Sequence, residues 1–220
     1  MGGKPQNKVK IEWSPNFAYA IGLLATDGCL SKDGRHIDFT SNDKEQLLNF
    51  LKCLRITDAK ITEKHSGSSI NIGLRVQFSD VNFYRFLVSI GLMPKKSKII
   101  NEVQIPDQYF FDFLRGHFDG DGSFYSYWDP RWKSSYMFYT SFTSASENHI
   151  KWLRNRIFDL LGINGHISKA KMASWYSLRY AKKDSVKLLD KLYRGRGICL
   201  SRKYLKIHDA LFIMSKLPKK

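Results

Sequence analysis

The sequence predicts an α+β protein in which one unit, ordered helix, two strands, helix, two strands and helix, occurs twice. The first reason is an internal repeat: Tyr19 to Gly28 and Phe113 to Gly122 both read as apolar helices that end in Asp-Gly. The second reason is that two hairpin patterns follow each copy. The third is the alternation of apolar and polar residues along those hairpins, which is typical of antiparallel sheets with one buried face.

The elements of the first unit follow from local sequence patterns. Ser14 is a capping residue placed before a proline at the first helical position. Asp33-Gly34 lies between two short alternating segments and predicts a hairpin turn. Leucines at helical spacing predict the second helix, and Asp80 caps the third. We expect a loose basic arm over 1–13, helix 15–26, strands 29–32 and 35–40, helix 44–54, strands 60–65 and 70–78, and a helix that ends at 90.

The second unit is expected to repeat this order. A proline followed by an acid at 106–107 gives its first helix a similar opening turn. We expect strands 123–128 and 135–142, helix 147–161, strands 166–171 and 175–180, helix 184–192, and a final helix extended by the tail after Ala210. The two units are expected to form two domains, 1–105 and 106–220.

The composition indicates a polyanionic partner. The chain has 36 Lys and Arg against 20 Asp and Glu, a formal net charge of +16, and 43% hydrophobic residues. An excess this large in a folded protein favours nucleic acid over a membrane surface. The longest apolar run, 17–25, is too short to span a bilayer. Three widely spaced cysteines form no zinc pattern, so we expect packing roles and an intracellular, reducing compartment.

The two repeated helices are expected to pack in parallel through small residues. Ala18 and Gly22 stand four apart in the first copy, and Gly116 and Gly120 do so in the second. Small residues at this spacing let two helix backbones approach closely. Each copy ends in Asp-Gly, and glycine is the usual helix-terminating residue.

Parallel packing would bring Asp27 and Asp121 together. An acid in the last turn of a helix faces the negative end of the macrodipole, which costs about 0.3–1 kcal/mol, and a second carboxylate nearby adds repulsion. Such a pair is understandable if a divalent cation binds there. Mg²⁺ takes few oxygen ligands from the protein, with phosphate and water completing its shell. The pattern therefore predicts a metal site at these two acids.

The segments Ala20 to Gly28 and Leu114 to Gly122 resemble the LAGLIDADG motif of homing endonucleases, in the form with two motifs in one chain. The resemblance covers most of the sequence. It implies a pseudo-symmetric duplicated αββαββα fold, with two antiparallel saddle-shaped sheets and two central helices.

Each motif departs from the family pattern at one place. Ala25 stands where an acid is common, although the second motif keeps an acid at Asp119. His117 stands where an aliphatic residue is usual, and we expect it to pack within the helix pair. The last acid of the motif, which carries the catalytic acid in the family, is present in both copies.

The resemblance implies a monomeric, site-specific DNA endonuclease that makes metal-dependent double-strand breaks in a long asymmetric target. Asp27 and Asp121 would be both catalytic residues and metal ligands, and Gly28 and Gly122 are included in the expected metal site. The expected cofactor is Mg²⁺, with Mn²⁺ as a substitute and Ca²⁺ supporting binding without cleavage.

Lys96 and Lys203 differ from the other lysines because they occupy corresponding places near the ends of the two units. The resemblance implies a basic residue from this region near each active site, where it polarises water or stabilises the phosphate. These two lysines therefore complete the expected catalytic set. The alternative is a solvated lysine that follows a helix.

The polar faces of the two sheets are expected to bind duplex DNA. They are rich in the side chains that read base edges in a major groove. A strand rises about 3.3 Å per residue, close to the base-pair spacing of about 3.4 Å, so a curved ribbon can follow the groove. A merely solvated face is the alternative. The expected contacts are Ser31, Lys32, Arg35, His36, Asp38, Thr40, Lys60, Thr62, Lys64, Asn71, Arg75, Gln77, Tyr125, Tyr127, Arg131, Lys133, Tyr139, Ser141, Lys169, Lys171, Ser177 and Arg179.

Two other functions fit the same fold. One is a DNA-binding regulator without cleavage activity, which the retention of both costly acids argues against. The other is an RNA-splicing maturase, which a basic surface outside the sheets would favour.

Overall fold

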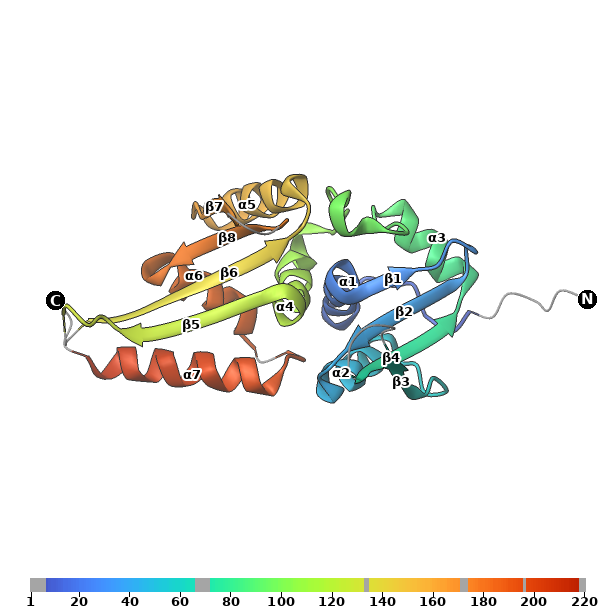
Figure 1. Cartoon of the computed structure of the whole chain (residues 1–220), viewed down its shortest axis with the longest axis horizontal. Coiled ribbons are helices and arrows are strands. Elements are labelled where there is room, and N and C mark those ends of the chain that lie inside the picture. The colour runs from blue at the N-terminus through green and yellow to red at the C-terminus, as the bar shows by residue number, and fades with distance from the viewer. Residues whose placement is uncertain (1–6, 66–71, 133–134, 171–173, 196, 218–220) are drawn as a thin grey trace, which may run out of the picture.

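The computed structural model describes residues 7–65, 72–132, 135–170, 174–195 and 197–217. Two four-stranded antiparallel sheets lie on either side of a central pair of helices (Figure 1). Each sheet belongs to one half of the chain, as the repeated pattern predicts. Within the described ranges, no helix is long and apolar enough to cross a membrane.

The first half has the predicted order of elements. Its sheet is arranged β1-β2-β4-β3. The elements are α1 (Pro15–Asp27), β1 (Gly28–Leu30), β2 (His36–Ser41), α2 (Lys44–Leu54), β3 (Ile61–His65), β4 (Ile72–Ser79) and α3 (Val81–Ser89).

The second half repeats this order and adds one helix. Its sheet is arranged β5-β6-β8-β7, the same order as the first. Short 3₁₀ turns at Lys96–Lys98 and Asp107–Tyr109 precede it. The elements are α4 (Phe110–Asp121), β5 (Gly122–Trp128), β6 (Tyr136–Ser144), α5 (Glu147–Leu161), β7 (His166–Lys169), β8 (Tyr176–Ala181), α6 (Lys182–Tyr193) and α7 (Ser201–Lys216).

The alternation predicted for the strands is confirmed. Ile37 pairs with Phe78 across the first sheet, and Phe142 pairs with Leu178 across the second. All four side chains are buried. Because side chains alternate along a strand, the neighbouring residues point to the opposite face of each sheet.

The residues that precede α1 are fixed to the first half, so the expected loose arm is wrong for its described part. One carboxylate oxygen of Asp80 accepts hydrogen bonds from the main-chain N–H groups of Lys8 at 2.8 Å and Val9 at 3.0 Å. The other oxygen caps α3 through the N–H of Phe83 at 2.9 Å. The indole of Trp13 packs edge-on against Phe17. One buried acid thus holds a helix start and the entering chain together.

The helices α1 and α4 run in the same direction and pack backbone against backbone. A Cβ atom added at Gly116 would lie 2.0 Å from the carbonyl oxygen of Tyr19, and one added at Gly22 would lie 2.1 Å from that of Phe113. Nearer the helix ends, a Cβ atom at Gly120 would lie 2.0 Å from the hydroxyl oxygen of Thr26. Glycine is therefore required at each of these places, as the small-residue spacing predicts.

The glycine after each acid has a different role from the predicted one. Gly28 has φ −77° and ψ 149°, and Gly122 has φ −84° and ψ 154°. Both are extended residues that begin a strand, and neither is a left-handed helix terminator. A Cβ atom would lie 2.6 Å from the carbonyl oxygen of Leu24 in one case and 2.5 Å from that of Phe118 in the other. Lack of space requires glycine here.

His117 packs in the interior, as expected. Its side chain is 1% exposed, and its Nε2 atom lies 3.1 Å from Nε2 of His149. The Nδ1 atom of His149 lies 2.6 Å from the carbonyl oxygen of Asn101, which fixes its proton on that side. Burial lowers the pKa of both imidazoles, that of His149 to about 4. Both rings are neutral at physiological pH.

Helix α7 connects the two halves of the chain. Its first residue, Ser201, donates a hydrogen bond from its N–H to Glu45 of α2 at 3.0 Å. The next residue, Arg202, lies 2.8 Å from a carboxylate oxygen of Asp43. The start of α7 is therefore held by the first half, whereas its buried Ile207 and Ala210 belong to the common core.

The helix contact generates a stability prediction. Replacing Gly116 by alanine places a methyl group on a backbone oxygen that cannot move alone, so Gly116→Ala should lower the free energy of unfolding by about 3 kcal/mol or more. Denaturant unfolding followed by circular dichroism measures the change.

Gly73→Ala is the matched control, because its Cβ atom would meet its neighbours at 3.5 Å or more. Its effect should stay within about 0.5 kcal/mol. Equal stability of the two variants would contradict the close backbone contact.

Candidate active site

The two central helices each end in an acid, and the two acids lie at the same end of the helix pair. Asp27 ends α1 and Asp121 ends α4. A Cβ atom at Gly120 would lie 3.0 Å from a carboxylate oxygen of Asp27, so the two helix ends lie side by side. The parallel packing expected from the sequence therefore brings one acid from each half together.

Both acids have raised pKa values. The pKa of Asp27 is about 6, against an ordinary value of 3.8. Burial is the main cause of this rise, and the charge of Asp121 is the second. Burial also raises the pKa of Asp121. In both cases the positive charges of Lys96 and Lys203 act in the opposite direction. The ionised form of both carboxyl groups is thus disfavoured unless further positive charge is supplied.

Lys96 lies at the end of α1 and is 5% exposed. Its ammonium group donates hydrogen bonds to the carbonyl oxygen of Thr26 at 3.2 Å and to that of Gly28. The last carbonyl groups of a helix have no partner within the helix, and this lysine provides one. Burial lowers the pKa of the ammonium group, although the nearby acids favour its charged form.

Lys203 holds the end of α4 in the same way, but from the first turns of α7. Its ammonium group donates to the carbonyl oxygens of Phe118 at 2.6 Å, Asp119 at 2.9 Å and Gly122 at 2.7 Å. Burial lowers the pKa of Lys203 to about 8. Positive charge is favourable at the negative end of a helix, so each lysine offsets part of the cost of the acid beside it.

Three buried side chains attach the segment that carries Lys203 to the helix pair. One oxygen of Asp119 accepts hydrogen bonds from the Tyr19 hydroxyl and from the N–H of Leu200, both at 2.8 Å. The guanidinium group of Arg115 donates to the carbonyl oxygens of Leu192 at 2.9 Å and Ile198 at 3.0 Å. The sequence shows Asp119 only as an acid retained in the second motif. Its buried hydrogen bonds show that it joins the helix pair to the segment before α7.

An open groove lies beside Asp27. The residues that line it are Asp27, Thr40, Ser41, Asn42, Asp43, Lys44, Gln46, Asp119, Gly120 and Arg202. Ser41 and Asn42 were not among the expected site residues. They lie where β2 ends, a position that pattern alone does not connect with α1.

The chemistry of the two acids fits a divalent cation that takes few ligands from protein. Among the described residues, no group of three or more His, Cys, Asp or Glu side chains is arranged to hold a metal. Mg²⁺ is commonly bound through one or two carboxylates plus phosphate and water, so Asp27 and Asp121 suffice. The carbonyl oxygens of Gly28 and Gly122 accept hydrogen bonds from Lys96 and Lys203. An ammonium group beside each makes these carbonyls poor partners for a second cation.

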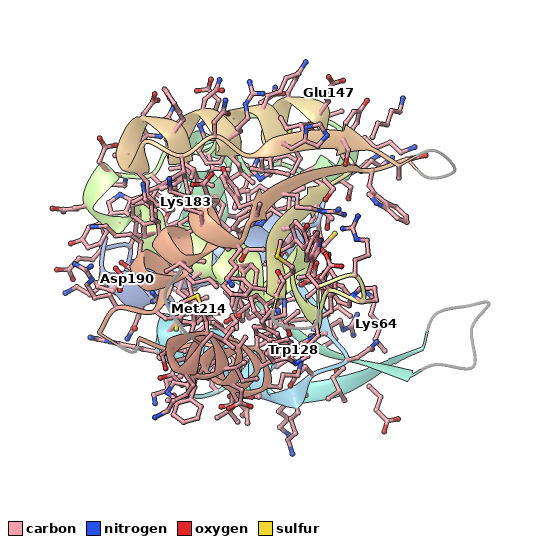
Figure 2. The ribbon with its side chains drawn as sticks, turned by 90° about the vertical axis from the view of Figure 1, so that its left-hand side faces the viewer. Lys64, Trp128, Glu147, Lys183, Asp190 and Met214 are labelled. Carbon is pink, nitrogen blue, oxygen red and sulfur yellow. The ribbon has the colours of Figure 1, made fainter. Side chains whose placement is uncertain are left out.

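The first sheet gathers most of its expected contact residues on one face. Arg75 is opposite both Thr40 and Thr62, and Asp38 is opposite Gln77. The expected residues on this face, or beside it in the turn and at the strand start, are Ser31, Lys32, Arg35, His36, Asp38, Thr40, Lys60, Thr62, Lys64, Arg75 and Gln77. In Figure 2, Lys64 lies on one side of the molecule, whereas Lys183 and Asp190 of α6 lie on the opposite side.

Two exposed groups at the hairpin turn are already paired. Asp33 accepts hydrogen bonds from the N–H groups of Arg35 at 3.2 Å and His36 at 3.1 Å, and it pairs with the imidazole of His36. These bonds hold the pKa of the Asp33 carboxyl well below its usual range. His36 is therefore oriented by the turn as well as by its strand.

The second sheet gathers a different set. Ser123 and Tyr125 are opposite Ser141 and Tyr139, and Arg179 is also opposite Ser141. The expected residues on this face are Tyr125, Tyr127, Tyr139, Ser141, Ser177 and Arg179, and the register adds Ser123, His166 and Ser168. Arg131 lies in the loop after β5, where it pairs with Asp129 at 3.0 Å.

Lys169 lies on the opposite face from the one expected. It pairs with Tyr176, in phase with Ile167 and Leu178, so it points to the helix side of the sheet. Its ammonium group lies 5.6 Å from the centre of the Tyr176 ring. Asn71, Lys133 and Lys171, three other expected contacts, lie outside the described residues.

No protein-family model matches this sequence, and no curated protein sequence matches it. Solved structures match the fold. The homing endonuclease I-WcaI bound to its DNA recognition sequence aligns over 94% of both chains with a TM-score of 0.63 and 16% identity. The fold is the LAGLIDADG fold. Both motifs lie in this one chain, with the helices α1 and α4 as the central pair.

Two further structures share the LAGLIDADG fold. The meganuclease I-SmaMI bound to uncleaveable DNA aligns over 95% of this chain and 92% of its own, with a TM-score of 0.60 and 17% identity. Full-length WhiA from Thermatoga maritima aligns over 94% of this chain and 71% of its own, with a TM-score of 0.55 and 15% identity. At these identities the likeness shows the fold and not the activity.

The raised pKa of Asp27 generates a prediction on stability. Between about pH 4 and 6 the folded protein binds a proton at Asp27 that the unfolded chain does not bind, so the free energy of unfolding falls as the pH rises through this window. In metal-free protein at pH 8, Asp27→Asn should therefore raise stability, by at most about 3 kcal/mol. Denaturant unfolding at pH 8 and pH 4 measures the effect, which should vanish at pH 4.

Asp159→Asn, an exposed acid of α5, serves as the control and should change little at either pH. Added Mg²⁺ should stabilise the unsubstituted protein more than Asp27→Asn. A destabilised Asp27→Asn protein at pH 8 would contradict the strained state of this carboxylate.

Proposed function

We propose that this protein is a site-specific DNA endonuclease that hydrolyses both strands of a duplex with the help of a divalent cation. The observation that carries the proposal is the pair of acids at adjoining helix ends. Asp27 and Asp121 are partly buried, carry raised pKa values and lie at the unfavourable end of each macrodipole. Such groups lower stability, and a cation and phosphate site accounts for them.

The partner proposed is double-stranded DNA. The net charge of +16 provides long-range attraction to a polyanion. Two polar sheet faces, one from each half, flank the acids. A duplex that lies across both faces would have its phosphate backbone over the ends of α1 and α4. The matching structures of I-WcaI and I-SmaMI named above contain DNA.

The proposed cation is Mg²⁺, held by Asp27 and Asp121. When bound, it would neutralise phosphate charge and promote ionisation of water. Mn²⁺ is expected to substitute, and Ca²⁺ to allow binding without cleavage. One of the I-SmaMI structures has an uncleaved DNA target in the presence of calcium ions.

Each lysine has two tasks in this proposal. Lys96 and Lys203 hold the helix ends in place, and their charges favour the ionised form of both acids. An ammonium group beside each acid would also stabilise the negative charge that develops on a phosphate during hydrolysis. The raised pKa values of the acids and the lowered ones of the lysines indicate a shared, weakly hydrated site.

We further infer that the two units, 1–105 and 106–220, each bind one half of an asymmetric target and that the protein acts as a monomer. The two faces carry different side chains at matching positions, such as Ser31 against Tyr125 and Lys60 against His166. A single chain with both acids needs no partner subunit to complete the catalytic pair.

Cleavage should require both acids and a divalent cation. Asp27→Asn and Asp121→Asn should each abolish double-strand cleavage while leaving the Kd for duplex DNA nearly unchanged, because the acids serve the cation. Cleavage assays on sites selected from a randomised duplex library, with Mg²⁺, Ca²⁺ or EDTA, measure this.

Asp159→Asn should cut normally. Full activity of Asp27→Asn would refute the assigned site, and binding without cleavage by the unsubstituted protein would indicate a DNA-binding protein on this scaffold.

The two lysines should affect the two strands unequally, since each belongs to one helix end. Lys96→Met should slow one strand more than the other, and Lys203→Met should show the opposite bias, so nicked duplex accumulates in both cases. Strand-resolved gels with differently labelled ends measure the two rates.

Lys183→Met, on α6 away from the sheet faces, is the control and should leave both rates unchanged. The same bias for both lysine variants, or a sedimentation mass that shows an obligate dimer, would contradict the monomeric arrangement.

A further inference from the structure

The two sheet faces differ in chemistry although they share one topology. The first face holds several charged groups, including Asp38, Lys64 and Arg75. Among the described residues on the strands of the second face, Arg179 is the one Lys or Arg side chain. Identical folds with such different surfaces should recognise different features of their target.

The middle of the second face is an aromatic surface. Tyr125 is directly opposite Tyr139, and Tyr127 is directly opposite Met137. The ring centres of Tyr125 and Tyr127 are 5.4 Å apart, and those of Tyr127 and Tyr139 are 6.4 Å apart and nearly parallel. Tyr125 is 61% exposed. These side chains form a continuous, partly apolar surface, here called the tyrosine patch: Tyr125, Tyr127, Met137 and Tyr139.

One pair of hydroxyl groups in the tyrosine patch, those of Tyr127 and Tyr139, interacts within the patch. A hydrogen bond with Tyr139 is the main cause of a raised pKa at the Tyr127 hydroxyl. The guanidinium carbon of Arg179 lies 5.7 Å from the centre of the Tyr139 ring. The adjoining rings of Tyr125, Tyr127 and Tyr139 are therefore a main feature offered to a partner.

The first face contrasts with this in its hydrogen-bonding groups. The amide of Gln77 donates to Asp38 at 3.4 Å, and the ammonium group of Lys64 donates to Thr40 at 3.2 Å. The guanidinium group of Arg75 lies 3.8 Å from Asp38. Such donors and acceptors suit the polar edges of bases.

Only one base edge in the major groove of unmodified DNA offers an apolar group, the 5-methyl of thymine. Apolar side chains recognise it by contact, and the burial of one methyl group against a ring removes it from water. The rings of Tyr125 and Tyr139 each lie against that of Tyr127, and these contacts reduce the side-chain freedom that is lost when the patch meets such groups.

We propose that the tyrosine patch recognises thymine methyl groups in the half-site bound by the second repeat, so that this half-site is selected for thymine. This inference rests on the proposed function. Tyr125 and Tyr127 follow Gly122 by three and five residues, which places them roughly 10 and 17 Å along β5 from the acids. The preferred thymines should thus lie roughly three to five base pairs from the nearer scissile phosphate.

The test uses the full-length protein and the duplex selected by its own cleavage. The half-site whose base preference changes in Arg75→Ala is assigned to the first sheet, and the other to the second. Every thymine of one half-site is then replaced by deoxyuridine, which keeps the hydrogen-bonding groups and lacks only the methyl. In EDTA, Kd should rise about fourfold for each contacted thymine of the second half-site, and less than twofold overall for the first.

Two variants show whether the ring is responsible. Tyr125→Ser should bring the ratio of Kd values for deoxyuridine and thymine duplexes toward one, whereas Tyr125→Phe should keep it. Because each ratio compares two duplexes on the same protein, a general loss of affinity cancels. If Tyr125→Ser does not fold, the ratio for Tyr125→Phe still separates ring from hydroxyl.

Equal sensitivity of the two half-sites, a second half-site without thymine at these positions, or loss of the ratio in Tyr125→Phe would each overturn the inference. If the protein cleaves its site but its Kd does not depend on the thymine methyl groups, the inference about the tyrosine patch is overturned and the proposed function stands. A protein that binds no duplex would overturn both.

Discussion

The close contact between α1 and α4 is the constraint on which the rest of the structure depends. Gly22 and Gly116 let two backbones meet where any side chain would separate them. That contact aligns two helix ends, and with them Asp27 and Asp121. It also directs β1 and β5, which follow these ends without a loop, into two sheets on either side. The position of the two acids thus depends on the close approach that this pair of glycines allows.

The helix ends show how a costly arrangement is made tolerable. An acid at the end of a helix, with a second acid beside it, is unfavourable in electrostatic terms. Lys96 and Lys203 compensate in part, since their ammonium groups satisfy carbonyl oxygens and bring positive charge to the acids. Their own burial lowers their pKa values, so the compensation is incomplete. The remaining imbalance is what a cation would relieve.

Sequence patterns predicted the duplication, the helix pair, the acids and the alternation of the strands, because each is encoded by residues close together in the chain. Features set by distant contacts were less predictable. Lys169 was placed on the wrong face, since a shift of one residue in register exchanges the two faces of a strand. The role of Asp119 depends on Leu200, which lies far away in sequence. Gly28 was expected to end the helix through its backbone conformation, whereas the structure requires glycine there for lack of space.

The start of α7 returns the chain to the half in which it began. Ser201 bonds to Glu45, and Arg202 pairs with Asp43, so the segment that carries the lysine of the second half rests on a helix of the first. The halves are therefore not interchangeable modules. A chimaera that joins one half to a half from another protein would have to transfer residues 43–45 and 201–202 as a matched set, or it would lose the support of one lysine.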